Sequence, residues 1–165
     1  MSPLWQELSQ SVPQPDKVVR VALRMIVALI IGTAIGLQRE LSHKPAGLRT
    51  HLLVAVGTAL LVVAAVNADM KSADVSRVIQ GLITGIGFLG GGTILKLTQE
   101  HEIRGLTTAA GIWLTAAASV AAGLGEFADA FIGVIFALIV LTAIGKIGGQ
   151  PSDRRESESS DRHGV

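Results

Sequence analysis

Five stretches of this chain contain no Asp, Glu, Lys or Arg, and they constrain its fold more than any other feature. They cover residues 25–38, 50–68, 78–95, 105–125 and 130–145. A helix of roughly 20 apolar residues crosses the hydrocarbon core of a bilayer. With short extensions of the first and last stretches, all five come close to that length. The pattern therefore predicts an all-α fold, a polytopic transmembrane helical bundle of five spans.

The predicted transmembrane domain covers residues 18–147, with a short segment on either side. Residues 1–17 include Trp5, which suits a short interfacial helix at headgroup level, and a cleaved signal peptide is the weaker alternative. Residues 148–165 are polar and have little to bury, so we expect a disordered cytoplasmic tail. The expected spans are 18–37, 50–66, 78–95, 105–124 and 128–147.

The composition agrees with a membrane protein. Charged residues make up 16% of the chain, where soluble domains average roughly 25%. No stretch has a charged face at helical period, which argues against the alternative of a water-soluble helical bundle. The absence of cysteine excludes thiol catalysis and cysteine-ligated metals. A net charge of +1 argues against a nucleic-acid partner.

Lysine and arginine are distributed unequally between the two ends of the predicted bundle. Of the 14 in the chain, 5 lie on the side of the N-terminus and 9 on the opposite side. In membrane proteins the cytoplasmic side carries the excess. We therefore expect the N-terminus outside and the C-terminus in the cytoplasm. Arg20 and Arg24 count against this orientation, and Arg24 is the candidate intramembrane charge.

The third expected span carries glycines on two separate arcs of the helix. Small residues let membrane helices approach closely, so two glycine faces predict two close neighbours and a central position. The run at residues 90–92 also weakens the helix and permits a break. A broken helix could bind a ligand through its exposed backbone, and plain close packing is the alternative. The packing candidates are Gly81, Gly85, Gly87, Gly90, Gly91 and Gly92.

Polar residues gather at the predicted cytoplasmic ends of the first, second and fourth spans. The sequence Gly-Leu-x-Thr occurs at 47–50 and again at 105–108, each time at an expected helix start. Helix N-termini with nearby arginines can bind an anion such as a phosphate, a carboxylate or a lipid headgroup. Each arginine can instead be a topology anchor. The candidates for this anion or partner site are Arg39, Glu40, Arg49, Thr50, His51, Arg104, Thr107 and Thr108.

Four motifs in a fixed order resemble the MgtC/SapB family of bacterial inner-membrane proteins. They are Gly-Leu-x-Arg-Glu at 36–40, Ala-Gly-Leu-Arg-Thr-His at 46–51, Gly-Ile-Gly-Phe-Leu-Gly-Gly-Gly at 85–92 and Arg-Gly-Leu-Thr-Thr-Ala-Ala-Gly-Ile-Trp at 104–113. The resemblance implies a multi-pass inner-membrane protein. In the MgtC branch it also implies a relation to magnesium-limited growth, to virulence and to the modulation of other membrane proteins.

This chain departs from the family pattern at two places. The family usually has Glu where Gln38 stands. The MgtC branch has a folded cytoplasmic domain after the last span, whereas only the polar tail follows here. The resemblance alone therefore gives no expectation about functions that depend on that domain.

Two functional classes fit these observations. In the first, the chain is a regulatory or accessory protein that binds the transmembrane helices of another membrane protein, or of further copies in a homo-oligomer. In the second, it is a transporter or channel component for magnesium or another small ion. Carboxylates, the usual ligands of Mg²⁺, lie outside the expected spans, which favours the first class. No nucleotide-binding loop or catalytic nucleophile is recognisable, so we expect no enzymatic activity, cofactor or assigned metal.

Overall fold

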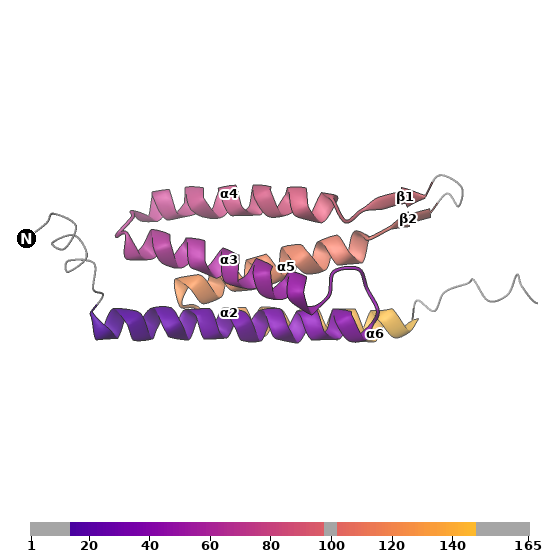
Figure 1. The fold of residues 1–165 in the computed structure, drawn as a ribbon, viewed down its shortest axis with the longest axis horizontal. Coiled ribbons are helices and arrows are strands. Elements are labelled where there is room, and N and C mark those ends of the chain that lie inside the picture. The colour runs from indigo at the N-terminus through magenta and orange to yellow at the C-terminus, as the bar shows by residue number, and fades with distance from the viewer. Residues whose placement is uncertain (1–13, 98–101, 148–165) are drawn as a thin grey trace, which may run out of the picture.

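The structure, a computed structural model, describes residues 14–97 and 102–147 of the chain. The predicted all-α bundle is confirmed, because the described residues form five helices that lie along one long axis (Figure 1). The expected interfacial helix around Trp5 and the expected C-terminal tail lie outside the described residues. The elements are α2 (Pro15–Leu41), α3 (Leu48–Asn67), α4 (Ser72–Gly91), β1 (Leu95–Leu97), β2 (Glu102–Arg104), α5 (Leu106–Leu124) and α6 (Phe127–Ile147).

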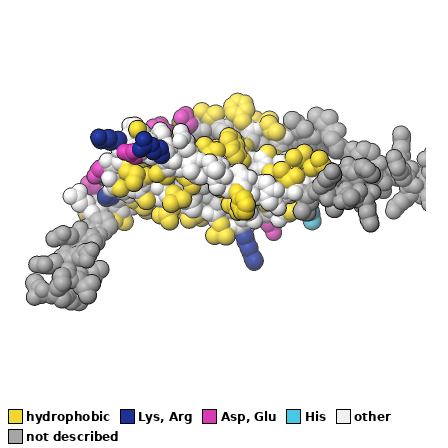
Figure 2. All heavy atoms as spheres, turned by 90° about the horizontal axis from the view of Figure 1, so that it is seen from above, with side chains coloured by type: hydrophobic (Ala, Val, Ile, Leu, Met, Phe, Trp, Pro, Cys, Tyr) yellow, Lys and Arg dark blue, Asp and Glu magenta, His cyan; other side chains and the backbone are white. Residues whose placement is uncertain are grey.

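Three of the described helices, α2, α3 and α5, are long and apolar enough to cross a membrane. The helix α6 has 21 residues and is apolar over Phe127–Ala143. The helix α4 has 20 residues but begins at Ser72 rather than at residue 78, so its first turns contain Asp74 and Arg77. Figure 2 shows apolar and uncharged side chains over the middle of the bundle, with a group of Lys, Arg, Asp and Glu side chains at one of its ends.

A short antiparallel hairpin between α4 and α5 was not predicted. The third span was expected to continue to residue 95, but α4 ends at Gly91, because the three consecutive glycines have low helix propensity. Strand β1 then pairs with β2, with Leu95 opposite Arg104. Gly105 follows β2 with a φ of 96°, in the left-handed region that glycine adopts readily, and α5 starts at the next residue.

The central helix of the bundle is α5, not α4. It packs against α2, α3, α4 and α6, whereas α4 contacts α5 and, more sparsely, α3 (Figure 1). The prediction of a central glycine-rich third span is therefore wrong. Small side chains (Ala, Gly, Ser and Thr) recur around the circumference of α5, so neighbours can approach it from several sides.

The glycines of α4 do not make the predicted close packing within the described chain. A Cβ atom added at Gly81, Gly85, Gly87 or Gly91 would meet no atom within 4 Å. At Gly90 it would make ordinary contact with Ala109 of α5, 3.6 Å away. Gly92 faces only backbone atoms of its own preceding turn. Within the described residues α4 therefore contacts α5 and α3 without the expected close glycine packing, and much of its surface faces outward.

Close helix contacts occur instead at glycines on α2 and α5. A Cβ atom at Gly36 would lie 2.9 Å from the Cα of Leu48, and one at Gly32 would lie 2.9 Å from the carbonyl oxygen of His51. At Gly123 it would lie 2.8 Å from the Cβ of Val62. Gly32 and Gly36 have the small-x-x-x-small spacing that brings membrane helices together, a signal that the sequence analysis overlooked.

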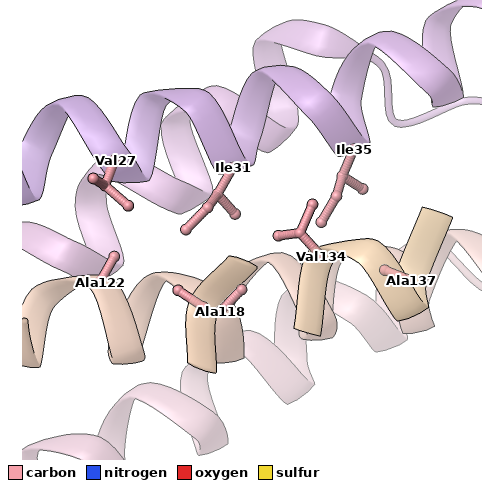
Figure 3. Packing of buried hydrophobic residues seen from close by; sticks show 8 residues of the cluster. Val27, Ile31, Ile35, Ala118, Ala122, Val134 and Ala137 are labelled. Carbon is pink, nitrogen blue, oxygen red and sulfur yellow. The ribbon is translucent and has the colours of Figure 1, made fainter. Parts of the chain in front are cut away.

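An apolar cluster joins α2 to α5 and α6 on the other side of α2. In Figure 3 the branched side chains of Val27, Ile31 and Ile35 point toward the facing helices. They meet Ala118 and Ala122 of α5, and α6 contributes Val134 and Ala137 to the same cluster. Large side chains opposite alanines let the helices pack closely without voids. This packing fixes the rotation of α2 about its axis.

Candidate functional site

The bundle encloses several polar side chains, which are costly in a membrane-spanning segment and often functional there. In the described part of the chain they come from α2, α3 and α5, and each is at most 3% exposed. One is cationic, one is an imidazole and the others are hydroxyls. They are Arg39, His51, Thr58, Thr108, Thr115 and Ser119. We refer to Arg39, His51, Thr108, Thr115 and Ser119 as the interior polar cluster.

Arg39 extends the buried stripe of α2 by one further turn. Ile31, Ile35 and Arg39 follow one another at intervals of four residues, so they share one face of the helix. The guanidinium Nη2 donates to Thr108 Oγ1 of α5 at 2.9 Å. The buried Nε has no hydrogen-bond partner, and no carboxylate in the described chain pairs with this arginine. Arg39 is therefore a buried cation held by a neutral hydroxyl.

His51 connects α3 to α5. Its Nδ1 lies 2.7 Å from Thr115 Oγ1, and that hydroxyl donates to the carbonyl oxygen of Gly111 at 2.9 Å. A threonine hydroxyl has one proton, so the bond with His51 requires Nδ1–H as the donor. In this tautomer the neutral ring presents Nε2 as an acceptor, and this buried atom makes no hydrogen bond with the described residues. Among the described residues, the interior polar cluster thus contains a buried donor without a partner at Arg39 and a buried acceptor without a partner at His51, besides the unpaired hydroxyl of Ser119.

The structure separates the predicted site residues into two groups. Arg39, His51 and Thr108 come together inside the bundle. The others, which are Glu40, Arg49, Thr50, Arg104 and Thr107, are exposed. Gly47 and Gly105 are N-caps of α3 and α5, as the repeated motif predicts, but Thr50 points outward while its counterpart Thr108 is buried.

Glu40 contacts the start of α3. Its Oε2 accepts a hydrogen bond from the backbone N–H of Leu48 at 2.8 Å and lies directly against Gly47. A carboxylate is stabilising at a helix N-terminus, where backbone N–H groups lack partners. The start of α3 is therefore already occupied by an acidic side chain of the same chain.

Thr115 and Ser119 were not among the predicted site residues. They lie on α5, where Thr108, Thr115 and Ser119 recur at intervals of seven and four residues and therefore share one face. That periodicity is visible in the sequence, but hydroxyl residues inside an uncharged stretch carry no charge signal that marks them as site residues. Ser119 Oγ is buried and has no partner within the described structure.

Arg24, the candidate intramembrane charge, belongs to the opposite end of the bundle. It is half-buried, and its Nη1 donates to the carbonyl oxygen of Gly123 at 2.9 Å, in the last turn of α5. The carbonyl groups at a helix C-terminus carry partial negative charge and attract a cation. Arg24 thus contacts the end of α5 and does not belong to the interior polar cluster.

The side chains of the interior polar cluster suit a neutral or anionic ligand. A buried guanidinium repels a metal cation, and its free Nε–H can donate to a water or an anion. The free His51 Nε2 can accept from a water bound to the same cluster. Among the described residues, no group of three or more His, Asp or Glu side chains is placed to hold a metal ion.

Replacement of Thr115 by valine is expected to destabilise the protein by about 1–3 kcal/mol, because the buried Nδ1–H of His51 loses its acceptor. The side chains have nearly the same shape, so packing changes little. Thermal unfolding of the purified protein in detergent measures the effect. Thr115→Ser keeps the hydroxyl and is the matched control. Equal losses in both variants would mean that packing, rather than this hydrogen bond, dominates.

Comparison with known proteins relates the chain to a family of bacterial proteins. The MgtC family profile matches residues 25–149. Protein SrpB from Synechococcus elongatus is 38% identical over 146 residues, which cover 82% of this chain and 80% of that protein. The putative magnesium transporter YhiD from Escherichia coli K12 is 40% identical over 126 residues, covering 72% of this chain and 58% of YhiD.

Protein MgtC from Salmonella typhimurium is 36% identical over 116 residues, covering 70% of this chain and 48% of MgtC. This chain therefore spans most of SrpB but only about half of MgtC. No solved structure matches the chain significantly.

Proposed function

This chain belongs to the MgtC family of membrane proteins, and from that premise we propose that it is a regulatory or accessory protein of the bacterial inner membrane. It acts without a catalytic step of its own. Its physiological setting is magnesium homeostasis, and it works through contacts with another membrane protein or within a homo-oligomer. The printed name of the relative YhiD, a putative magnesium transporter, supports the setting. The surface of α4 supports the mode of action.

The open face of α4 is the observation that carries the proposal. Gly81 and Gly85 form one small-x-x-x-small pair, and Gly87 and Gly91 form a second, all four with open space around them. The two pairs lie on separate arcs of α4, both outside its buried residues Ile86 and Gly90, and bulky exposed side chains such as Phe88, which is 84% exposed, lie between them. Small residues flanked by large ones suit the close approach of another transmembrane helix.

Ion transport is the second candidate, and it is favoured by the printed name of YhiD, a putative magnesium transporter. The interior polar cluster argues against it for a divalent cation. Its buried charge is the guanidinium of Arg39, and the other groups are an imidazole and hydroxyls. Mg²⁺ usually binds through carboxylates and waters, and a fixed positive charge on the path repels it.

Leucine at Gly85 or Gly87 tests the role of the α4 face. Both variants are expected to fold and insert normally, because there is open space at each position. Both are expected to lose the ability to restore growth in low magnesium to a strain that lacks the protein, because the new side chain blocks a partner helix. Gly57→Leu is the matched control, since Gly57 is an exposed helical glycine of α3 with equally open surroundings.

Growth that is normal in all three variants would contradict a binding role for α4. The transporter alternative has its own test, which is uptake of Mg²⁺ by liposomes that contain the purified protein. We expect uptake equal to that of empty vesicles. Uptake well above that level, reduced by a change at Arg39, would replace the accessory function with transport.

We further propose that the protein crosses the inner membrane five times, with its N-terminus outside and its C-terminus in the cytoplasm. The excess of Lys and Arg on the side of the C-terminus supports this orientation. A reporter that is active only in the cytoplasm is expected to work after Gln150 and to fail at the N-terminus. Activity at both positions would indicate an even number of spans.

A further inference from the structure

A polar pocket opens at the end of the bundle where α2 begins and α3 ends. Its volume is about 270 Å³. Lys17, Arg20 and Arg24 line it together with one acidic side chain, Asp69. The lining side chains therefore carry three positive charges and one negative charge, a net charge of +2. This pocket is separate from the interior polar cluster, which lies toward the other end of α2.

The three basic residues converge because they share one face of α2. Residues 17, 20 and 24 are separated by three and four positions, the spacing of neighbours on a helix surface. Lys17 Nζ donates to the carbonyl oxygen of Asn67 at 3.2 Å, and Arg24 Nη1 donates to Gly123 in the same way. These two contacts attach the outer members of the trio to the C-terminal ends of α3 and α5.

Arg20 stands between the two attached cations and is exposed. It makes no hydrogen bond or ion pair with any residue that the structure describes. Lys17 and Arg24 each use one donor in their backbone contacts, while an ammonium has three and a guanidinium five. The pocket therefore offers several unused N–H donors within a positively charged recess, an arrangement that suits the oxygen atoms of a phosphate group.

The position of the pocket identifies the source of that phosphate. The helices α2 and α3 are long and apolar enough to span a bilayer, so the ends that meet here lie at headgroup depth. Val21 and Val66 also line the pocket, so part of its wall is apolar. A lipid places an anionic phosphate beside apolar ester and acyl groups, which a free phosphate ion does not. Basic pockets between transmembrane helices bind lipid headgroups in this way.

We propose that this pocket binds the phosphate of an anionic phospholipid, with Arg20 as its main contact and Lys17 and Arg24 beside it. The proposal requires that the protein span the membrane, but it is independent of the orientation and of the partner of α4. It also gives Arg20 and Arg24 a role that accounts for their place on the side with fewer positive charges. Arg20 and Arg24 are evidence against the expected orientation only if their sole function is to set the topology.

The test is native mass spectrometry of the purified full chain with phosphatidylglycerol, and with phosphatidylcholine as the zwitterionic reference. The wild-type protein is expected to retain phosphatidylglycerol preferentially. Arg20→Gln is expected to weaken that retention about fivefold, the effect typical of one basic residue at an anionic surface. Arg20→Lys keeps the charge and is expected to restore most of it. Arg77→Gln is the matched control, because Arg77 is exposed at the same end and pairs with Asp74.

A second arm separates a lipid from a free ion. Titration of the protein in lipid-free micelles with inorganic phosphate is expected to show no binding that depends on Arg20. Such binding, together with equal lipid retention by all variants, would overturn the assignment to a lipid. Equal loss in Arg20→Gln and Arg77→Gln would reduce the effect to general surface charge and would also overturn the proposal. Neither the lipid experiment nor the phosphate titration measures growth. Failure of this proposal can therefore be distinguished from failure of the proposed function, which the growth test of the α4 variants measures.

Discussion

Replacing Gly36 by leucine is expected to prevent stable assembly of the bundle. Even the first carbon of the new side chain would lie 2.9 Å from the Cα of Leu48 and 3.0 Å from the Cβ of His51. Backbone cannot rotate away as a flexible side chain can, so α2 and α3 must move apart. Overpacking of this kind costs about 1–3 kcal/mol and sometimes more. We expect the upper end of that range, measured as unfolding of the purified protein in detergent.

The matched control is the same substitution at Gly85. Nothing lies within 4 Å of a Cβ atom there, so Gly85→Leu is expected to leave stability unchanged or slightly increased, since leucine is a better helix former than glycine, which lies roughly 0.8–1 kcal/mol below alanine. Gly36→Ala gives an intermediate case, because it adds only the first carbon. A Gly36→Leu protein as stable as the Gly85→Leu protein would refute the close contact of α2 with α3.

The contrast between these two glycines also marks how far the fold could be predicted from the sequence. Stretches without charge predict where helices occur, because a membrane tolerates few charges in a spanning segment. Glycine spacing indicates that a helix has a face for close approach, but it does not indicate what approaches. Gly36 meets α3 of the same chain, whereas Gly85 faces open space. The position of α4 at the edge could therefore not be predicted.

The end of α4 illustrates a second limit. The absence of charged residues up to residue 95 favoured a helix to that point, yet three consecutive glycines end it at Gly91. The following residues then pair in a hairpin with residues 102–104. Hydropathy averaged over a whole stretch does not report the low helix propensity of a few consecutive residues. The weakness of the glycine run was recognised from the sequence, but its result was expected to be a broken helix rather than a strand.

Only part of the site was predicted, because the sequence shows where charged residues are but not which side chains become buried. Arg39 and Thr108 were selected because they flank helix ends, but their burial follows from helical periodicity. Ile31, Ile35 and Arg39 occupy successive turns of one face, and this sequence pattern could have predicted that Arg39 points inward. Hydroxyl residues such as Ser119 give no charge signal, and their inward direction depends on which side of α5 meets α2 and α3. Only tertiary packing determines that side.

Replacement of Arg39 by methionine is expected to separate the stability of the protein from its function. The guanidinium is 3% exposed, donates to the neutral hydroxyl of Thr108, and leaves its Nε without a partner. Replacing a buried ion pair by apolar side chains of similar size is often neutral or stabilising, by about 1–4 kcal/mol, and Arg39 has no ion-pair partner among the described residues to lose. We therefore expect Arg39→Met to keep or raise the unfolding temperature and to lose growth in low magnesium.

Two further variants make this result interpretable. Arg39→Met together with Thr108→Val removes both partners of the hydrogen bond. The double variant therefore lacks the stability cost of the Thr108 hydroxyl that Arg39→Met alone leaves unpaired. Arg39→Lys keeps the charge but lacks the planar guanidinium, so it tests whether charge alone suffices for growth. A large fall in unfolding temperature in the double variant would identify Arg39 as a structural residue. Retained stability with lost growth would mean that the buried charge is kept, at a cost in stability, for what the interior polar cluster binds or contacts.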